Sequence, residues 1–233
     1  SIVVCIRYYG KYRLPEEPLG HIGKYYLADQ RMPLCPDYQL PLRMEAGFER
    51  LDLRYKAAKV PDRWAAARAG FTRTAEHGTW VNIDTWVVET ELTPDEPTLD
   101  IPCPPDCRAC IDACPTGALV EPFVMRMDHC IANLSYHTPH PIQQELWEKM
   151  GGWIYGCDAC QDACPMNKGK WVEQEDAFWQ FDVAEHLSPE ALANMDEGTY
   201  RTIVYPRFWY NFADEIARWH ANAKRALKSK RER

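Results

Sequence analysis

The sequence predicts a mixed α/β region, followed by a region that depends on bound metal and then by a helical C-terminal region. Three observations lead to this division. Apolar, strand-like runs lie before residue 100, eight cysteines gather among prolines and glycines between residues 103 and 164, and helix signals follow. We place the three regions at residues 1–100, 101–170 and 171–233.

Composition excludes several classes of protein. The chain has 233 residues with 46% hydrophobic and 12% aromatic content, which is enough to bury a core and excludes a disordered protein. It contains no apolar run of about 18 residues and no secretory signal, so we expect no membrane span and a cytoplasmic protein. The net charge of −7 argues against a protein that binds nucleic acid over its whole surface.

The first region, residues 1–100, is predicted to be α/β. Apolar runs at residues 2–6 and 80–88 predict buried strands. Between them, Asp62 is predicted to cap the start of a helix that Gly70 ends. Because the chain opens at Ser1 and enters a strand at once, we expect that a preceding segment is missing.

The second region, residues 101–170, contains an internal repeat. Residues 107–115 and 157–165 agree at seven of nine positions, and each of their three cysteines recurs at an offset of fifty residues. Their shared pattern, C-x2-C-x3-C-P, is the core of the bacterial two-cluster ferredoxin signature. In that signature, the cysteine before proline binds a different 4Fe–4S cluster from its neighbours.

Two further cysteines complete the predicted ligand set. Cys103 stands four positions before the first repeat and Cys130 lies between the repeats, so each of two clusters obtains four thiolates. Cross-ligation assigns to the first cluster Cys103, Cys107, Cys110 and Cys164. It assigns to the second cluster Cys114, Cys130, Cys157 and Cys160. A pair of structural zinc sites is the alternative, although zinc does not require the x3-C-P tail.

The third region, residues 171–233, is predicted to be helical. Ser188 followed by Pro189 marks a helix start. Four apolar residues share one face of the last helix: Ile216, Trp219, Ala223 and Leu227. Six basic residues crowd its end: Lys224, Arg225, Lys228, Lys230, Arg231 and Arg233. These cations either hold the phosphate backbone of an RNA or complement the helix dipole in solvent.

The cysteine region resembles a known family. The runs at residues 107–119 (CRACIDACPTGAL) and 154–167 (IYGCDACQDACPMN) resemble epoxyqueuosine reductases and, more distantly, corrinoid reductive dehalogenases. The resemblance implies an α/β (α+β) cobalamin-binding-like domain, followed by a bacterial two-cluster ferredoxin-like domain and a C-terminal helical segment. It also supports the cross-ligation given above. Cys5 lies in a predicted buried strand and Cys35 lies beside Pro36, so we expect both to be unligated thiols.

The resemblance further implies an iron–sulfur oxidoreductase. Electrons would pass from a low-potential donor of ferredoxin or flavodoxin type through two 4Fe–4S clusters to a reductive site, with cobalamin as a further cofactor and a modified base of tRNA as substrate. Corrin contacts would fall at residues 132–135 and 155–156. The family's proton-donating aspartate has no counterpart here, and Tyr55 with Lys56 stands at its position. A non-catalytic electron-transfer protein of ferredoxin type is the alternative.

Overall fold

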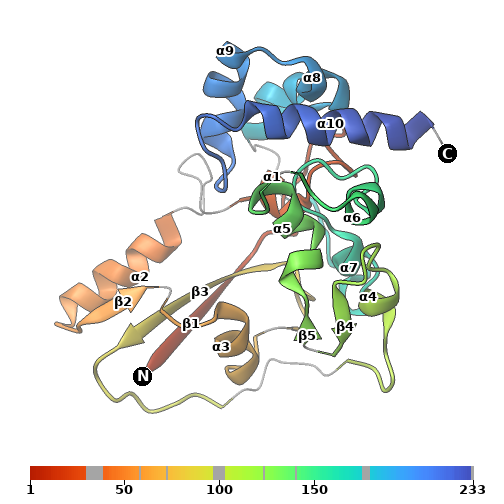
Figure 1. Cartoon of the computed structure of the whole chain (residues 1–233). Helices are drawn as coiled ribbons and strands as arrows, with labels where there is room; N and C mark the ends of the chain where they lie inside the picture. Colours follow the sequence, from red (N-terminus) through yellow and green to blue (C-terminus); the bar gives the residue numbers. More distant parts are fainter. Residues whose placement is uncertain are drawn as a thin grey trace.

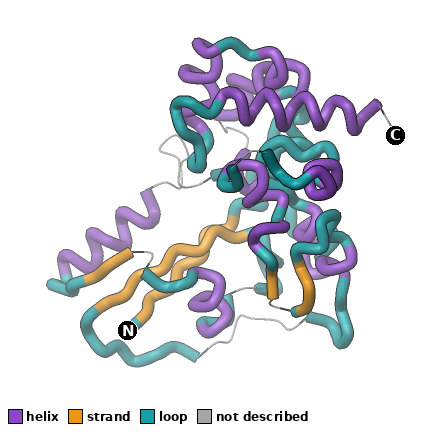
Figure 2. The backbone as a smooth tube through the Cα atoms, viewed as in Figure 1, coloured by secondary structure: helices purple, strands orange, loops and turns teal. Residues whose placement is uncertain are grey.

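The structure, a computed structural model, describes residues 1–29, 39–57, 59–71, 73–96, 103–122, 124–139, 141–174 and 179–231. A small sheet lies at one end of the molecule, a layer of helices lies at the other, and the cysteine region lies beside both (Figure 1). Short helices and loops dominate the cysteine region (Figure 2). In the described part of the chain, no helix is both long enough and apolar enough to cross a membrane.

The sheet is antiparallel and contains β1 (Ile2–Tyr8), β2 (Tyr55–Ala57) and β3 (Val81–Val88) in the order β1-β3-β2. Both strands expected from the apolar runs are therefore confirmed. Helix α2 (Gln39–Arg50) packs its Phe48 against Trp86 and Val88 of β3. Across the two long strands, the buried Arg7 pairs with Asp84, with 2.6 Å between Nε and Oδ2.

Helix α3 (Asp62–Arg68) contacts β1 and β3. Its end agrees with the prediction, because Gly70 has φ +75° and the next N–H, that of Phe71, donates to the Ala66 carbonyl at 2.8 Å. Its start does not agree. Pro61 is the cap residue, and the Asp62 carboxylate instead accepts a hydrogen bond from the Thr85 hydroxyl at 2.7 Å, which ties the helix to the sheet.

The cysteine region is built from short elements. In chain order these are α4 (Ala109–Asp112), β4 (Leu119–Glu121), β5 (Val124–Met125), η2 (Met127–His129), α5 (Ile131–Tyr136), α6 (Gln144–Lys149), α7 (Ala159–Asp162) and η3 (Pro165–Asn167). All residues of α4 and α7 keep some exposure to solvent. In contrast, α5 and α6 bury Ile131, Leu134 and Leu146 in a small core of their own.

The C-terminal region is helical, as predicted. Its elements are η4 (Trp179–Leu187), α8 (Pro189–Asn194), α9 (Glu197–Thr199), η5 (Tyr200–Val204), η6 (Tyr205–Arg207) and α10 (Ile216–Arg231). The Ser188 hydroxyl accepts a hydrogen bond from the Ala191 N–H at 3.2 Å, so the predicted cap is confirmed. Trp219 of α10 is buried and stacks on Tyr155, with ring centroids 4.9 Å apart. The largest core therefore joins α10 to the cysteine region and to α1 (Lys24–Leu27).

Candidate metal centre and the adjoining hollow

The two cysteine repeats have the same local structure. In each repeat, a four-residue helix begins two residues after the first cysteine and carries the second cysteine, and the third cysteine follows the helix. The residue before the first cysteine has a left-handed backbone in both, with φ +55° at Asp106 and +75° at Gly156. Helices α4 and α7 contact each other, so the repeats face one another (Figure 1).

The mutual electrostatic influence of the thiols shows which cysteines are neighbours. Burial raises the pKa of Cys160 to about 11, with contributions from Cys130 and Cys114 among its neighbours. Burial raises the pKa of Cys164 as well, and Cys103 and Cys110 add to that rise. Cys114 thus lies near the second repeat, and Cys164 lies near the first. Cys110 of the first repeat also influences Cys160, so these interactions bring the two repeats together without dividing the thiols into two sets of four.

The described side chains do not form a single-ion metal site. Within the described ranges, no three His, Cys, Asp or Glu side chains converge closely enough to hold one metal ion. A structural zinc needs four ligands at about 2.0–2.3 Å from a single centre. The thiolates of a 4Fe–4S cluster each bind a different iron, so they stand farther apart. The described side chains therefore form no site for a single metal ion of this kind.

Backbone N–H groups point at several of these sulfurs. The Ala118 N–H donates to the Cys114 Sγ at 3.2 Å, and the Ala159 N–H donates to the Cys157 Sγ at 3.5 Å. Burial acts to raise the pKa of Cys114, but hydrogen bonds from Leu119 and other neighbours outweigh it, so the pKa is lowered. Such donors favour the thiolate form that a cluster requires and tune its reduction potential.

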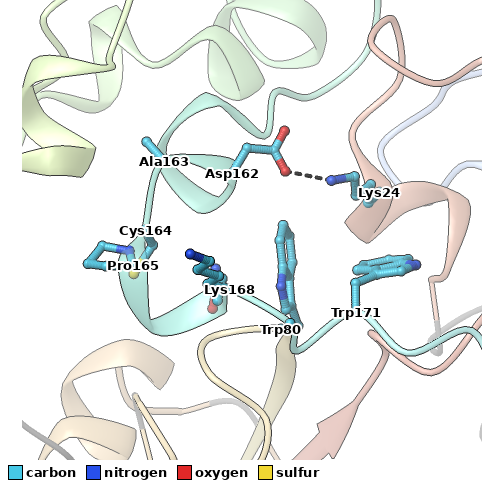
Figure 3. A pocket seen from close by; sticks show the side chains of 10 residues that line it. Lys24, Trp80, Asp162, Ala163, Cys164, Pro165, Lys168 and Trp171 are labelled. Atoms are coloured by element: carbon cyan, nitrogen blue, oxygen red, sulfur yellow. Dashed lines mark hydrogen bonds and ion pairs between the residues drawn. The ribbon is translucent and has the colours of Figure 1, made fainter.

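A hollow of about 400 Å³ opens beside Cys164. In Figure 3, Cys164 and Pro165 lie on one side of it and Trp80 and Trp171 lie on the other, with Lys168 between them. The two indole rings meet edge to face, with centroids 5.2 Å apart and planes at 87°. The hollow therefore joins an aromatic wall to a predicted cluster ligand.

Lys24 and Asp162 form the polar part of this hollow. The Lys24 Nζ lies 2.5 Å from the Asp162 Oδ1, and it also lies 4.9 Å from the Trp80 ring and 5.4 Å from the Trp171 ring (Figure 3). The Trp80 Nε1 is buried and has no hydrogen-bond partner among the described residues. Sequence reasoning missed this hollow, because its lining comes from α1, the residue before β3, α7, η3 and the segment after η3.

The predicted pair of Tyr55 and Lys56 is not brought to the cysteines. Both residues line a second hollow, of about 500 Å³, whose lining in the described part of the chain includes no cysteine. Adjacent residues of a strand point to opposite faces, so the two side chains do not form a pair. Partial burial and the carboxylates of Glu45 and Glu49 raise the pKa of Tyr55.

The residues expected to contact a corrin ring lie in the core. Leu134, Ser135 and Tyr155 are at most 1% exposed. Helix α10 covers them, since the Asn222 side chain donates to the Ser135 carbonyl at 3.1 Å and Trp219 stacks on Tyr155. Neither hollow is lined by residues 132–135 or 155–156. Ala132 and Asn133 keep partial exposure, so the expected corrin contacts at these positions stay a prediction.

The basic end of α10 divides into two parts. Lys224, Lys228 and Lys230 are exposed, whereas Arg225 is only 8% exposed. Arg225 donates to the Gly151 and Trp153 carbonyls, so it is a structural residue and is not available to bind phosphate. The side chain of Arg231, and the whole of Arg233 and Cys35, lie outside the described residues. Cys5 lies half-buried on β1, apart from the repeats.

Comparison with known proteins agrees with this site. Residues 103–167 match the family model described as a 4Fe-4S double cluster binding domain. The epoxyqueuosine reductase of Shewanella oneidensis is 38% identical over 140 residues, which are 57% of this chain and 36% of that protein. The epoxyqueuosine reductase of Shigella dysenteriae is 35% identical over 178 residues, which are 71% of this chain and 46% of that protein.

Solved structures give the same result over nearly the whole chain. The structure of the Bacillus subtilis epoxyqueuosine reductase matches with a TM-score of 0.73 and 26% identity, over 98% of this chain and 64% of that one. An epoxyqueuosine reductase structure with a tRNA stem loop matches with a TM-score of 0.72 and 25% identity, over the same shares. The chain spans less than half the length of the curated relatives named above. The predicted resemblance to epoxyqueuosine reductases is therefore confirmed.

Proposed function

We propose that this protein is an iron–sulfur oxidoreductase of the epoxyqueuosine reductase type. It takes electrons from a low-potential donor of ferredoxin or flavodoxin type and delivers them, in the cytoplasm, to a modified base carried by tRNA. The observation that carries this proposal is the pair of repeats, which share one local structure and face each other across α4 and α7. Two such units supply ligands for two one-electron centres held close together.

The proposed ligands are those of the cross-ligated arrangement. The first cluster is held by Cys103, Cys107, Cys110 and Cys164. The second cluster is held by Cys114, Cys130, Cys157 and Cys160. The order of influence supports this division, because Cys130 and Cys114 act on Cys160 more strongly than Cys110 does, and Cys103 and Cys110 act on Cys164. The cluster region is proposed to extend over residues 101–170, between an α/β region at 1–100 and a helical region at 171–233.

When bound, the two clusters would supply two electrons, one from each. The chain's own contribution is to orient and protect the thiolates. Backbone N–H groups stabilise the charge on Cys114 and Cys157, and a core of tyrosines and tryptophans lies around α1, where Tyr26 contacts Tyr136 and Tyr155. Because Tyr155 lies two residues before Cys157, this core borders the second repeat, and an apolar border that limits water is one of the ways in which a protein sets a cluster's potential.

Neither of the two hollows described above has room for cobalamin, the further cofactor that the resemblance implies. The two hollows measure about 400 and 500 Å³. Pockets of roughly 300–1,000 Å³ suit drug-sized ligands, and a corrinoid is far larger than these. Two of the expected corrin contacts, Ser135 and Tyr155, are also covered by α10. No step of the proposed function is therefore assigned to cobalamin.

A tRNA substrate is supported by two observations. The exposed Lys224 and Lys228 stand four residues apart on α10, on a chain whose net charge is −7. One solved relative was determined with a tRNA stem loop. Cations on one helical face can hold an RNA backbone through its phosphates, with an affinity that falls steeply as salt rises.

Iron and sulfide analysis of anaerobically prepared protein tests the cluster assignment. We expect about eight iron and eight sulfide per chain, because four thiolates are available to each of two clusters. Cys114→Ala should disturb the cluster held mainly by the second repeat, while Cys5→Ala, the matched control, should leave the iron content unchanged. A value near four iron, or stoichiometric zinc, contradicts the proposal.

A ferredoxin-type electron carrier without catalytic activity is the second candidate. The lack of a match to the family's proton-donating aspartate favours it. Turnover decides between the two, using a stem-loop RNA that contains epoxyqueuosine, a chemical reductant and the iron-loaded protein. Formation of the reduced base supports the enzyme, whereas reduced clusters that never oxidise on addition of the RNA support the carrier.

A further inference from the structure

We propose that the hollow beside Cys164, lined by Trp80, Trp171, Lys24, Asp162 and Lys168, is the site that receives one unstacked nucleobase of the RNA. This inference rests on the proposed function, because it names the part of the chain that takes the substrate. Enzymes that act on a base must first bring it out of its stack and hold it in a pocket. The hollow has the wall, the polar groups and the position that such a pocket requires.

The wall of the hollow is aromatic. Trp80 is only 3% exposed and fixes one side, while Trp171 is partly exposed and meets it edge to face at 5.2 Å. Trp171 also packs against Tyr9, with ring centroids 6.0 Å apart, so its ring is held in place from behind. A rigid, partly exposed indole is the kind of surface on which single-stranded nucleic acids stack their bases.

The polar groups match the edge and the phosphate of a nucleotide. The Trp80 Nε1–H is a buried donor without a partner among the described residues, and a ring nitrogen or carbonyl of a base would satisfy it. Lys168 is exposed and lies within the hollow (Figure 3). Lys24 is paired with Asp162, so these two charges cancel and Lys168 leaves the hollow positive. A net positive rim beside an aromatic wall favours a planar ring that carries a phosphate.

The position of the hollow connects it to the metal centre. Cys164 and Pro165 form the side opposite the indoles, so a bound base would lie against a proposed ligand of the first cluster. A volume of about 400 Å³ is enough for one base and part of its ribose. Asn167 keeps this lining in place, because its side chain accepts from the Thr79 N–H at 2.7 Å and donates to the Gln161 carbonyl at 2.8 Å.

The test measures the binding of a fluorescently labelled tRNA anticodon stem loop to iron-loaded protein by anisotropy over a range of salt concentrations. Trp171→Ala should weaken binding about 5- to 100-fold, the range expected when one stacked base loses its aromatic partner. Trp171→Phe should restore most of the affinity. Lys168→Gln removes an exposed cation without touching the core. It should reduce the slope of the logarithm of the binding constant against the logarithm of the salt concentration (the salt slope) by about one.

Trp64→Ala is the matched control, since this tryptophan is 51% exposed on α3 and does not line the hollow. A stem loop with 2-aminopurine at each loop position in turn should show one position whose emission changes on binding to the wild type but not to Trp171→Ala. If Trp171→Ala and Lys168→Gln bind the stem loop as the wild type does, the assignment of the hollow is overturned while the RNA substrate stands. If the wild type binds no RNA even at low salt, both the assignment and the RNA substrate are overturned.

Discussion

Replacement of Arg225 separates the structural role of α10 from its proposed role in RNA binding. Arg225→Met keeps most of the aliphatic stem and removes the guanidinium. In the native protein, this group donates to the Gly151 carbonyl at 3.3 Å and to the Trp153 carbonyl. It also lies 4.6 Å from the centre of the Trp147 ring. The replacement therefore leaves two carbonyls without their donor and removes a cation–π contact.

The size of the effect follows from these contacts. Each carbonyl that loses its donor costs about 1–3 kcal/mol, and the cation–π contact is worth about 0.5–2 kcal/mol. Relief from burying the positive charge offsets part of this sum. We expect Arg225→Met to lower the free energy of unfolding by about 2–4 kcal/mol. In a chain of this length, the melting temperature then falls by roughly 5–15 °C.

Thermal unfolding followed by circular dichroism, on iron-loaded protein under anaerobic conditions, measures this change. Lys224→Met is the control, because Lys224 is the adjacent residue on the same helix and is exposed. Its effect on stability should stay within about 0.5 kcal/mol. The salt slope of RNA binding should respond in the opposite way, falling with Lys224→Met and not with Arg225→Met. Equal melting temperatures for the two variants would refute the structural role assigned to Arg225.

Two further predictions concern the second repeat. A methyl group at Gly156 would lie 2.3 Å from the Tyr26 ring, whereas one at Gly117 meets nothing within 4 Å, and both glycines have positive φ. Gly117→Ala should therefore lower the free energy of unfolding by about 1 kcal/mol through backbone strain. Gly156→Ala should lower it by more and should also reduce the iron content. Equal iron contents in the two variants would contradict this prediction. Burial raises the pKa of Asp158 from 3.8 to about 7, so its contribution to stability is complete below pH 3.8 and is lost as the pH rises through 7. The melting temperature of Asp158→Asn, relative to that of the wild type, should accordingly rise between pH 4 and 8. A difference that stays constant across that range would show that the pKa of Asp158 is not raised by burial.

The parts of the fold that the sequence predicted are those whose signals are local. The strands at β1 and β3 follow from apolar runs, the Ser188 cap follows from two adjacent residues, and the end of α3 follows from one glycine. The shared structure of the repeats also follows from spacing, because the same short pattern imposes the same helix and turn twice. The start of α3 was misplaced because Thr85, far along the chain, takes the carboxylate that would otherwise cap it.

The candidate site could be predicted only in part, for the same reason. Cysteine spacing predicts thiolate ligands from the sequence alone, since such a ligand needs only its residue type and its turn. The hollow needs Lys24, Trp80 and Trp171 to meet, and these residues are far apart in the sequence. The burial of Arg225 could not be predicted either. A helical pattern gives the side of the helix on which a residue lies, but it does not show which loop packs against that side.

One packing arrangement both covers Ser135 and Tyr155, two of the residues expected to contact a corrin, and fixes the position of the hollow. Helix α10 stacks Trp219 on Tyr155 and binds the Ser135 carbonyl through Asn222, which closes the surface around the residues expected to hold a corrin. Gly23 hydrogen-bonds to the Tyr155 carbonyl at 2.8 Å, so the same core fixes the start of α1. From that start, the backbone N–H of Lys24 reaches the Asp158 carboxylate at 2.8 Å and its ammonium reaches Asp162, both in the second repeat. Loosening α10 should therefore disturb Lys24 and the hollow through α1, even though α10 itself does not line the hollow.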